Sequence, residues 1–481
     1  MQPACHGGAQ LSVQRADLAN RPRMPYPSSS NASFPDNGSA LRRTPVAEPS
    51  RFPQGGPILT LDSAARAAVV RSGGVSGGGR PERSFRVSRT ALLKLAGYFI
   101  GCWGIIALLM AGIPYGGAFV VALALYTTIP LFVFLREGGW PSYPRKAFRL
   151  YVLRVFWYTQ LALPLVAGAG FIGMAIGAAF GAPLAGGRIG ATIIAVTLGI
   201  FVAIGYLGAS ALVVRELVVE LLDLPMDFDG FRIVQLTDLH IGPHLPRKRL
   251  ERIAREVAAM DPHLIAVTGD IVDDRAEDLE VYASVFASMT APNGVFLIPG
   301  NHDIYAGWPA VERRLRRGDL GTLLVNESRE IRRGDGVITL VGTGDPAGRG
   351  FPDSDVSPDI QRSLAGIPAG RTIVALAHNP ALFPALAEGG VGLTLSGHTH
   401  WGQVALPAAG WSMASLFLED AMGINTRGRS LLYISPGTGY WGIPFRIGAP
   451  GEITLVTLRR SQSGAPHARV TGRRRLSWRV G

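Results

Sequence analysis

Four long apolar stretches constrain this chain more than any other feature of its sequence. They lie near residues 92–113, 116–135, 157–180 and 190–214. A helix needs about 20 apolar residues to cross the hydrocarbon layer of a membrane, and Lys94 is the only charged residue within these four stretches. Buried helices of a soluble core would explain one such run. Four in succession favour a transmembrane region over residues 91–215 with about four spans.

The two ends of the chain are basic and poor in periodic apolar residues. Residues 1–94 carry 13 Lys and Arg against 5 acids, and residues 459–481 carry 7 Arg and no acid. We therefore expect a disordered basic N-terminal tail over residues 1–90 and a basic C-terminal tail over residues 460–481, both solvated near an anionic membrane face. No nucleic-acid partner is expected, because aromatic residues do not interleave with the basic ones.

The charges of the loops predict how the spans are oriented. Ten basic residues lie before the first span or between the second and third: Arg80, Arg83, Arg86, Arg89, Lys94, Arg136, Arg145, Lys146, Arg149 and Arg154. The other two loops hold only Arg188. Because positive charge marks the cytoplasmic side, an even number of spans places both the N-terminus and the C-terminal domain in the cytoplasm of a bacterial-type, multi-pass membrane protein.

From about residue 216 the sequence has the pattern of a mixed α/β domain, which we expect over residues 216–459. Short β-branched runs end in Gly, Asp or His: FRIVQLTD, LIAVTGD, GVFLIPG, ITLVGTGD, TIVALAHNP, VGLTLSGHTH and LLYISPG. Helical periodicity appears between them, as in RKRLERIAREVAAM and VERRLRR. In such folds, chemistry collects in the loops at the C-terminal ends of the strands.

Five short polar motifs follow these apolar strands. They are Asp238-Leu239-His240, Gly269-Asp270 with Asp273, Gly300-Asn301-His302-Asp303, His378-Asn379 and Gly397-His398-Thr399-His400. Five of the nine histidines of the chain fall within them. Scattered surface or core histidines would not gather at strand ends in this way, so the motifs favour a metal site.

The spacing of these residues indicates how ions would be held. Asp238 and His240 lie two apart, so both side chains of an extended segment point to one face and can grip one ion. His398 and His400 repeat that spacing. Asp270, at a strand end after a glycine, can offer one carboxylate oxygen to each of two ions. This mixed nitrogen and oxygen set suits Mn, Fe, Zn or Co, and a chain with only two cysteines has no thiolate site.

The ordered set of motifs resembles the calcineurin-like metallophosphoesterase superfamily. The superfamily pattern is D-x-H, G-D-x-x-D, G-N-H-D/E, H and G-H-x-H, and residues 216–459 match every element of it. The segment Ser435–Thr454 resembles the closing segment of a bacterial, membrane-linked branch. The resemblance implies an α/β fold of four layers, α-β-β-α, in which two packed mixed sheets are flanked by helices, here preceded by the four-helix transmembrane region.

The resemblance also implies a role for each motif residue. One metal would be held by Asp238, His240 and His400, and the other by Asn301, His378 and His398. Asp270 would bridge the two ions. His302 would stand beside the phosphate as a general acid, Asp273 would orient it, and Asp303 would support the site.

The implied activity is hydrolysis of phosphodiester, phosphomonoester or pyrophosphate bonds by a hydroxide that bridges two divalent metal ions. Membrane location alone suggests a lipid-linked substrate, with membrane lipids as partners. Residues 216–459 have neither a G-x-x-x-x-G-K-[ST] loop nor a G-x-S-x-G elbow, which disfavours a nucleotide-driven activity and serine hydrolysis. The alternative is a catalytically inactive membrane scaffold or sensor. A transporter is disfavoured because the spans carry no charge to line a pathway.

Three residues of the closing segment are candidates to line the mouth of the substrate site. They are Tyr440, Trp441 and Arg446. Arginine suits bidentate contact with a phosphate, whereas ordinary packing of a Gly-rich loop is the alternative for all three.

Overall fold

A computed structural model describes residues 89–137, 146–242, 245–351 and 355–476. The basic N-terminal tail predicted over residues 1–90 lies almost wholly outside the described residues. Four of the basic residues behind the orientation prediction also lie outside them: Arg80, Arg83, Arg86 and Arg145. The orientation therefore stays a prediction.

Each of the four apolar stretches forms a helix over most of its length. The helices are α2 (Arg89–Leu109), α3 (Gly116–Glu137), α5 (Arg154–Ala178) and α6 (Pro183–Ser210), with a short α4 (Lys146–Phe148) and a π-helical turn (Arg149–Leu153) before α5. Two segments are long and apolar enough to cross a membrane, Tyr151–Ala178 and Pro183–Ser210. The first two helices offer shorter apolar segments, Leu93–Leu109 and Gly116–Thr128, so the number of four spans is not confirmed.

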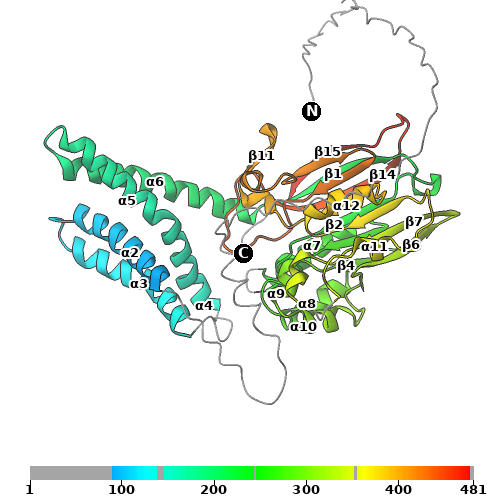
Figure 1. The fold of residues 1–481 in the computed structure, drawn as a ribbon, viewed down its shortest axis with the longest axis horizontal. Helices are drawn as coiled ribbons and strands as arrows, with labels where there is room; N and C mark the ends of the chain where they lie inside the picture. The colour runs from blue at the N-terminus through cyan, green and yellow to red at the C-terminus, as the bar shows by residue number, and fades with distance from the viewer. Residues whose placement is uncertain (1–88, 138–145, 243–244, 352–354, 477–481) are drawn as a thin grey trace, which may run out of the picture. The chain divides into compact units, whose positions relative to one another are not determined.

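Glycine allows α5 and α6 to pack closely side by side (Figure 1). A Cβ atom at Gly173 would overlap the backbone carbonyl oxygen of Gly186, and a Cβ atom at Gly186 would overlap that of Gly173. Small residues at a helix interface are typical of membrane helices, which associate through close backbone packing. The Gly-rich run of the third stretch is thus a packing surface.

The boundary between the helical region and the α/β domain differs from the prediction. The fourth stretch was expected to continue to residue 214, but α6 ends at Ser210 and strand β1 (Leu212–Leu221) begins two residues later. Leu212, Val213 and Val214 are buried. Apolar composition alone does not separate the last turn of a membrane helix from the start of a buried strand.

The first sheet has seven strands in the order β15-β1-β14-β2-β3-β4-β5. Besides β1, these are β2 (Arg232–Leu236), β3 (Leu264–Thr268), β4 (Val295–Ile298), β5 (Thr322–Leu323), β14 (Gly451–Arg460) and β15 (His467–Leu476). Strands β2 to β5 run parallel.

The expected flexible C-terminal tail is wrong for residues 467–476, which form β15. This strand pairs antiparallel with β1 along nearly its whole length. Its side chains are mostly exposed and basic because it is an edge strand, and charged residues protect such an edge from pairing with other chains. That composition is why the sequence resembles a solvated tail.

The second sheet has six strands in the order β12-β13-β9-β8-β7-β6. Their bounds are β6 (Glu327–Arg333), β7 (Gly336–Gly342), β8 (Ile373–Leu376), β9 (Leu393–Ser396), β12 (Gly423–Arg427) and β13 (Ser430–Ile434). Between β9 and β12 the chain forms an insert of short elements: η5 (His400–Gln403), β10 (Ala405–Leu406), η6 (Pro407–Ala409), β11 (Trp411–Ser412) and η7 (Met413–Leu416).

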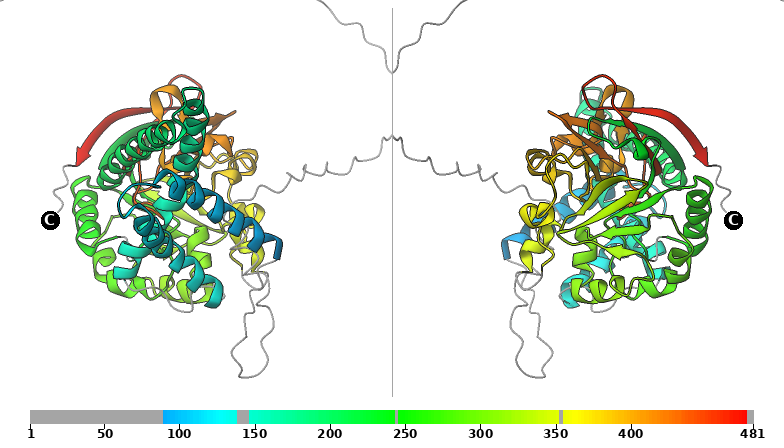
Figure 2. Two further views of the ribbon diagram at one scale, coloured as in Figure 1. Left: turned by 90° about the vertical axis from the view of Figure 1, so that its left-hand side faces the viewer. Right: turned by 90° about the vertical axis from the view of Figure 1, so that its right-hand side faces the viewer.

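The helices of the α/β domain lie on the outer sides of the two sheets (Figure 2). Those near the first sheet are α7 (Arg247–Ala259), α8 (Asp278–Ala287), α9 (Asn301–Tyr305) and α10 (Trp308–Leu315), and those near the second are α11 (Ile360–Leu364) and α12 (Phe383–Glu388). Short 3-10 turns occur at Met226–Phe228, Pro346–Gly350 and Pro380–Leu382.

The two sheets pack face to face, and β3 shows why the strand sequences are continuously apolar. Leu264 and Ala266 belong to the core between the sheets, whereas Ile265 and Val267 pack with the outer helices. Both faces of such a strand are buried, so no polar alternation remains. The predicted mixed α/β fold with two packed sheets is confirmed.

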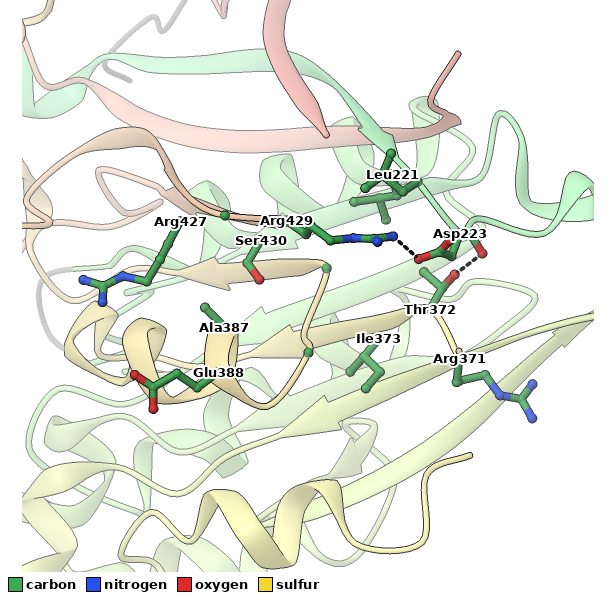
Figure 3. Close-up of a pocket in the computed structure, with 14 residues that line it drawn as sticks. Leu221, Asp223, Arg371, Thr372, Ile373, Ala387, Glu388, Arg427, Arg429 and Ser430 are labelled. Atoms are coloured by element: carbon green, nitrogen blue, oxygen red, sulfur yellow. Dashed lines mark hydrogen bonds and ion pairs between the residues drawn. The ribbon is translucent and has the colours of Figure 1, made fainter. Parts of the chain in front are cut away.

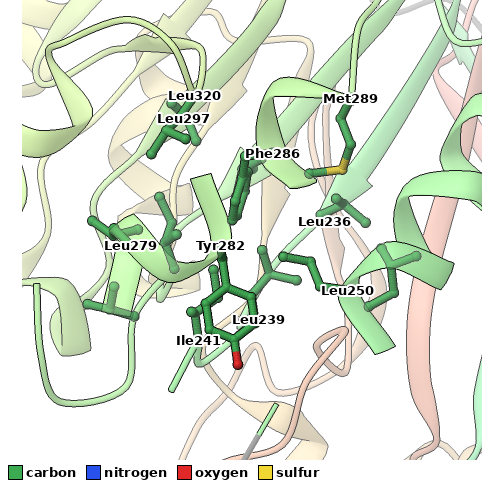
Figure 4. Close-up of a cluster of buried hydrophobic side chains, with 14 of the residues drawn as sticks. Leu236, Leu239, Ile241, Leu250, Leu279, Tyr282, Phe286, Met289, Leu297 and Leu320 are labelled. Carbon is green, nitrogen blue, oxygen red and sulfur yellow. The ribbon is translucent and has the colours of Figure 1, made fainter. Parts of the chain in front are cut away.

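The outer core also fixes the segment that follows β2. Leu239 and Ile241 are buried with Leu250 of α7 and with Tyr282 and Phe286 of α8 (Figure 4). The residues that alternate with them belong to the first polar motif, so burial of the apolar residues holds that motif in place.

Candidate metal centre

Seven predicted ligands meet where strands of both sheets end. Asp238 and His240 follow β2, Asp270 follows β3, Asn301 follows β4, His378 follows β8, and His398 and His400 follow β9. Within each sheet these strands are parallel, so their carboxyl ends lie at one edge. The two sheets therefore bring together side chains that are up to 162 positions apart in the sequence.

The first group of side chains consists of Asp238, His240 and His400. The Nε2 atoms of the two histidines lie 3.1 Å apart, and His400 Nε2 lies 3.3 Å from Asp238 Oδ1. All three side chains are at least nine-tenths buried. Two atoms bound to one ion at about 2.1 Å lie about 3 Å apart, so these donors have the separation that a shared ion requires.

The second group consists of Asn301, His378 and His398. The side-chain oxygen of Asn301 lies 2.8 Å from His398 Nδ1 and 3.3 Å from His378 Nε2. His378 is fully buried, and its Nδ1 lies 2.8 Å from the carbonyl oxygen of Thr268. A carbonyl partner requires the proton on Nδ1, which leaves Nε2 as a donor for a metal.

Asp270 lies between the two groups. Its Oδ2 atom is 3.2 Å from His378 Nε2 and 3.7 Å from His240 Nε2. Its Oδ1 atom accepts a hydrogen bond of 2.8 Å from the backbone N–H of His302. One carboxylate oxygen thus faces both groups of donors, as a bridging ligand must.

The backbone of the predicted ligands is unusually strained. Five of the ten described non-glycine residues with positive φ are predicted ligands: Asp238, His240, Asp270, His398 and His400. Such conformations cost about 1–3 kcal/mol each and cluster at functional sites. The expectation that Asp238 and His240 lie on an extended segment is therefore wrong. Both residues adopt left-handed conformations, and these turns direct their side chains into the site.

Glycines adjacent to the ligands allow the loops to approach one another. A Cβ atom at Gly269 would lie 2.6 Å from the ring of His378, and one at Gly300 would overlap Asp270. Asp303 reinforces this contact, because its buried carboxylate accepts hydrogen bonds from the backbone N–H groups of Ile271, Val272 and Gly300.

His302 and Asp273 lie beside the two groups, in an arrangement that differs in part from the implied one. The Nδ1 atom of His302 is 3.0 Å from the carbonyl oxygen of Asp273 and 3.8 Å from its carboxylate. The carboxylate of Asp273 lies closer to His240 Nδ1, at 3.1 Å. Asp273 thus orients His302 through its main chain, and its side chain orients His240.

Burial and charge set different proton affinities within the site. Burial alone would raise the pKa of Asp270, but His378 and His302 lower it well below its ordinary value. Burial lowers the pKa of His398 to about 3, and burial together with His240 and Arg446 lowers the pKa of His400 well below its ordinary value. Neutral histidines are the form that binds metals.

The three mouth candidates lie in different environments. Trp441 is 48% exposed, with its ring centroid 6.2 Å from that of His302, which agrees with a place at the mouth. Tyr440 is largely buried and accepts a hydrogen bond from Arg154 at 3.1 Å. Arg446 is 1% exposed, donates to the carbonyl oxygens of Pro436 and Ala449, and lies 3.1 Å from His400 Nδ1. Of the two alternatives for Arg446, the structure thus favours packing within the loop over contact with a phosphate.

Asp345 is a buried acid near the site that the sequence analysis did not single out. It follows β7, is 1% exposed, and accepts a hydrogen bond from the backbone N–H of Ala347. Burial raises its pKa to about 6. The run ITLVGTGD ends in this residue. Its position directly after a predicted strand is therefore the sequence signal that could have identified it.

A separate cavity of about 400 Å³ lies away from these side chains (Figure 3). It is lined by residues around Asp223, Thr372 and Arg429, and none of the predicted site residues contributes to it. Arg429 forms an ion pair of 2.8 Å with Asp223 across it. The charges of Asp223 and Arg429 are thus paired with each other.

The fold and the site define a phosphoesterase-type domain with a metal-ligand centre. Residues 231–402 match the calcineurin-like phosphoesterase family. Over this stretch, which carries all five polar motifs, the chain is similar to the calcineurin-like metallophosphoesterases.

Three curated relatives illustrate the match. An uncharacterised metallophosphoesterase of Helicobacter pylori is 32% identical over 47% of this chain and 59% of that protein. One of Campylobacter jejuni is 31% identical over 51% and 63%. A Danio rerio protein named transmembrane protein with metallophosphoesterase domain is 32% identical over 50% and 55%. The matched part of the chain thus spans between about half and two thirds of these relatives.

Proposed function

We propose that this chain is a membrane-anchored phosphoesterase that holds two divalent ions and hydrolyses phosphodiester, phosphomonoester or pyrophosphate bonds. The observation that carries the proposal is the position of Asp270 Oδ2, which faces both His240 and His378 at 3.2–3.7 Å. Each of these histidines belongs to a separate group of donors with separations suited to one ion. The arrangement supports two ions that share one carboxylate.

The donor set supports this assignment on chemical grounds. Asp238, His240 and His400 would hold one ion, and Asn301, His378 and His398 the other. Nitrogen and oxygen donors without thiolates suit Mn, Fe, Zn or Co. When bound, two such ions lower the pKa of water and neutralise the oxygens of the phosphate.

The remaining residues position and transfer protons. Asp273 holds the Nδ1 side of His302 through its carbonyl oxygen, so the opposite nitrogen, Nε2, is the atom that would donate a proton to the leaving oxygen. The neighbouring ring of Trp441 covers one side of His302. We assign Trp441 the role of excluding water from this proton transfer.

The proposal also includes membrane anchorage and a lipid-linked substrate. The two long apolar helices and the relatives named as transmembrane proteins support membrane association. The proposal of four spans follows from the four apolar stretches, and the cytoplasmic side of the catalytic domain follows from the loop charges. Protease treatment of intact cells tests on which side of the membrane the α/β domain lies. Cleavage of the domain by an external protease would contradict a cytoplasmic location.

Activity profiling of the purified full chain tests the proposed reaction. We expect hydrolysis of bis-p-nitrophenyl phosphate or of a lipid pyrophosphate with Mn, Fe, Zn or Co, and loss of that activity in His398→Ala. Activity toward soluble phosphates only would contradict the lipid-linked substrate. Bound metal without activity toward any substrate would contradict catalysis and support an inactive scaffold.

A further inference from the structure

The insert that follows the last predicted metal ligand carries a compact group of exposed apolar side chains. We call them the apolar patch: Leu406, Met413, Leu416, Phe417 and Leu418, which are 60%, 39%, 59%, 65% and 38% exposed. They are half of the ten large apolar side chains that the described part of residues 212–476 exposes. Single exposed apolar residues are normal on a soluble surface, but a contiguous group marks an interaction site.

The apolar patch is held firmly against the metal centre. Gly402, in the turn that begins with His400, has a φ of +61°, and a Cβ atom there would lie 2.5 Å from the backbone nitrogen of Ala414. The backbone N–H of Met413 donates to Val404 at 2.8 Å. The side-chain oxygens of Ser412 and Ser415 lie 3.0 Å apart and cap the turn that presents the patch. These contacts hold the backbone of the insert in one conformation, in which the side chains of the apolar patch are exposed to solvent.

The same insert is continuous with the last apolar helix. Val404 and Ile447 form a parallel bridge, in which the N–H of Ala405 donates to the carbonyl oxygen of Ile447 at 2.9 Å and the N–H of Ile447 donates to that of Gln403 at 2.9 Å. The preceding residue, Arg446, donates its backbone N–H to the carbonyl oxygen of Gly205 in α6 at 2.8 Å. A Cβ atom at Gly208 would overlap the carbonyl oxygen of Arg446. One short segment thus links the insert to the end of α6.

The chemistry of the insert favours a lipid surface as the occupant. Residues 404–426 contain no Lys or Arg and only two acids, Glu419 and Asp420. Attraction to anionic headgroups requires basic residues, so this segment would bind through apolar insertion. Near the end of α6, the apolar side chains of Phe201, Ile204 and Leu207 are exposed as well.

We propose that the apolar patch inserts into the boundary between headgroups and acyl chains, and so holds the metal centre at the membrane surface. This inference relies on the membrane anchorage proposed above but not on catalysis. An apolar side chain gains free energy when it leaves water for this boundary. Because the patch packs directly on the turn of His400, its insertion fixes the distance between the bilayer and the site.

Fluorescence quenching in the full chain tests the insertion. Cys5 and Cys102 are replaced by Ser, and an environment-sensitive fluorophore is attached at Phe417→Cys, with the chain in nanodiscs that contain lipids spin-labelled near the headgroup. We expect several-fold stronger quenching than at Val281→Cys, a control residue of α8 that is 58% exposed. Equal quenching at the two positions would overturn the inference.

A probe at Ile193→Cys, 58% exposed in α6, separates the two proposals. Quenching at Ile193 without quenching at Phe417 overturns the insertion and leaves the membrane anchorage standing. Absence of quenching at both positions overturns both. A Phe417 signal that depends on the number of chains per disc, and not on the spin label, would assign the patch to a second copy and also overturn the inference.

Activity gives an independent readout. The double variant Leu416→Ser, Phe417→Ser should hydrolyse a soluble diester at the unchanged rate. With a phosphoester presented in vesicles, its activity should fall at least about tenfold, because either of the two lost side chains contributes about that factor when it is buried. Val281→Ser should behave as the unaltered chain with both substrates. Equal losses with both substrates would mean that the patch only stabilises the fold, and would overturn the inference.

Discussion

Neighbouring histidines at the metal centre have opposite preferences for a proton. The charge of Asp270 raises the pKa of His378 well above its ordinary value despite burial, whereas burial lowers the pKa of His398 to about 3. Both rings contact the side-chain oxygen of Asn301. A cation in this position would replace the proton of His378 and neutralise the same carboxylate, so metal binding must compete with protons.

His302→Asn should lower the turnover number while the bound metal remains. The Nδ1 atom of His302 contacts the carbonyl oxygen of Asp273, and His302 belongs to neither group of predicted ligands. Loss of a general acid typically costs about 10²- to 10⁴-fold in rate. Turnover and metal content would be measured together, with His467→Gln on the exposed strand β15 as the control. A loss of metal equal to the loss of activity would instead make His302 a ligand.

Asp345→Asn should stabilise the protein at pH 7. The pKa of Asp345 is raised from 3.8 to about 6 by burial, so the folded state binds a proton more tightly than the unfolded state. Its contribution to stability is complete below pH 4 and is lost as the pH rises through 6. The shift corresponds to about 3 kcal/mol at most.

Thermal unfolding of the metal-free chain in detergent measures this effect. The melting temperature of Asp345→Asn should exceed that of the unaltered chain at pH 7, and the difference should shrink towards pH 4. Asp359→Asn, an exposed residue that also caps a helical turn, serves as the control. A constant difference at all pH values would contradict the assigned pKa.

At the scale of elements, the strands were predictable and several of their ends were not. Strands β3, β8 and β9 are buried on both faces, which leaves a β-branched run that the sequence displays directly. Strand β15 escaped prediction because an exposed basic edge resembles a tail. The left-handed turns at the ligands were also missed, since they depend on packing between loops that are distant in sequence.

Gly208→Ala should weaken the contact between α6 and the segment before β14. A Cβ atom there would overlap the carbonyl oxygen of Arg446, whereas Gly199, in the same helix, has no atom within 4 Å of such a Cβ. Alanine is otherwise the better helix former, by about 1 kcal/mol. We expect a lower melting temperature for Gly208→Ala and an equal or higher one for Gly199→Ala. Similar changes in both variants would contradict the close contact.

At the scale of the whole molecule, one segment joins the apolar helices to the metal centre. Tyr158 of α5 donates to the carbonyl oxygen of Pro444 at 3.1 Å, and Phe445 packs against Phe201 of α6 with ring centroids 5.2 Å apart. The side chain of the next residue, Arg446, lies 3.1 Å from His400 Nδ1. The sequence predicted the helices and the catalytic domain as separate regions. Their connection depends on tertiary contacts of a Gly- and Pro-rich loop, for which no periodic pattern exists.

The proposed ligand residues could be singled out from the sequence because the order and spacing of their motifs are visible there. Their convergence required the two sheets to pack face to face, which brings the end of β2 beside the end of β9. Asp238 shows the result, since its carboxylate accepts the backbone N–H of His398 at 3.1 Å across 160 positions. These motifs do not encode the identity of the proposed substrate, because they specify only the side chains that surround the proposed metal site.

Metal analysis of the purified full chain tests the central claim most directly. After loading with Mn and removal of free metal, the unaltered chain and the control Asp359→Asn should each retain two ions per chain, and Asp270→Asn should retain at most one. A chain that retains fewer than two ions, or an Asp270→Asn variant that still holds both, would contradict a centre in which two ions share one carboxylate.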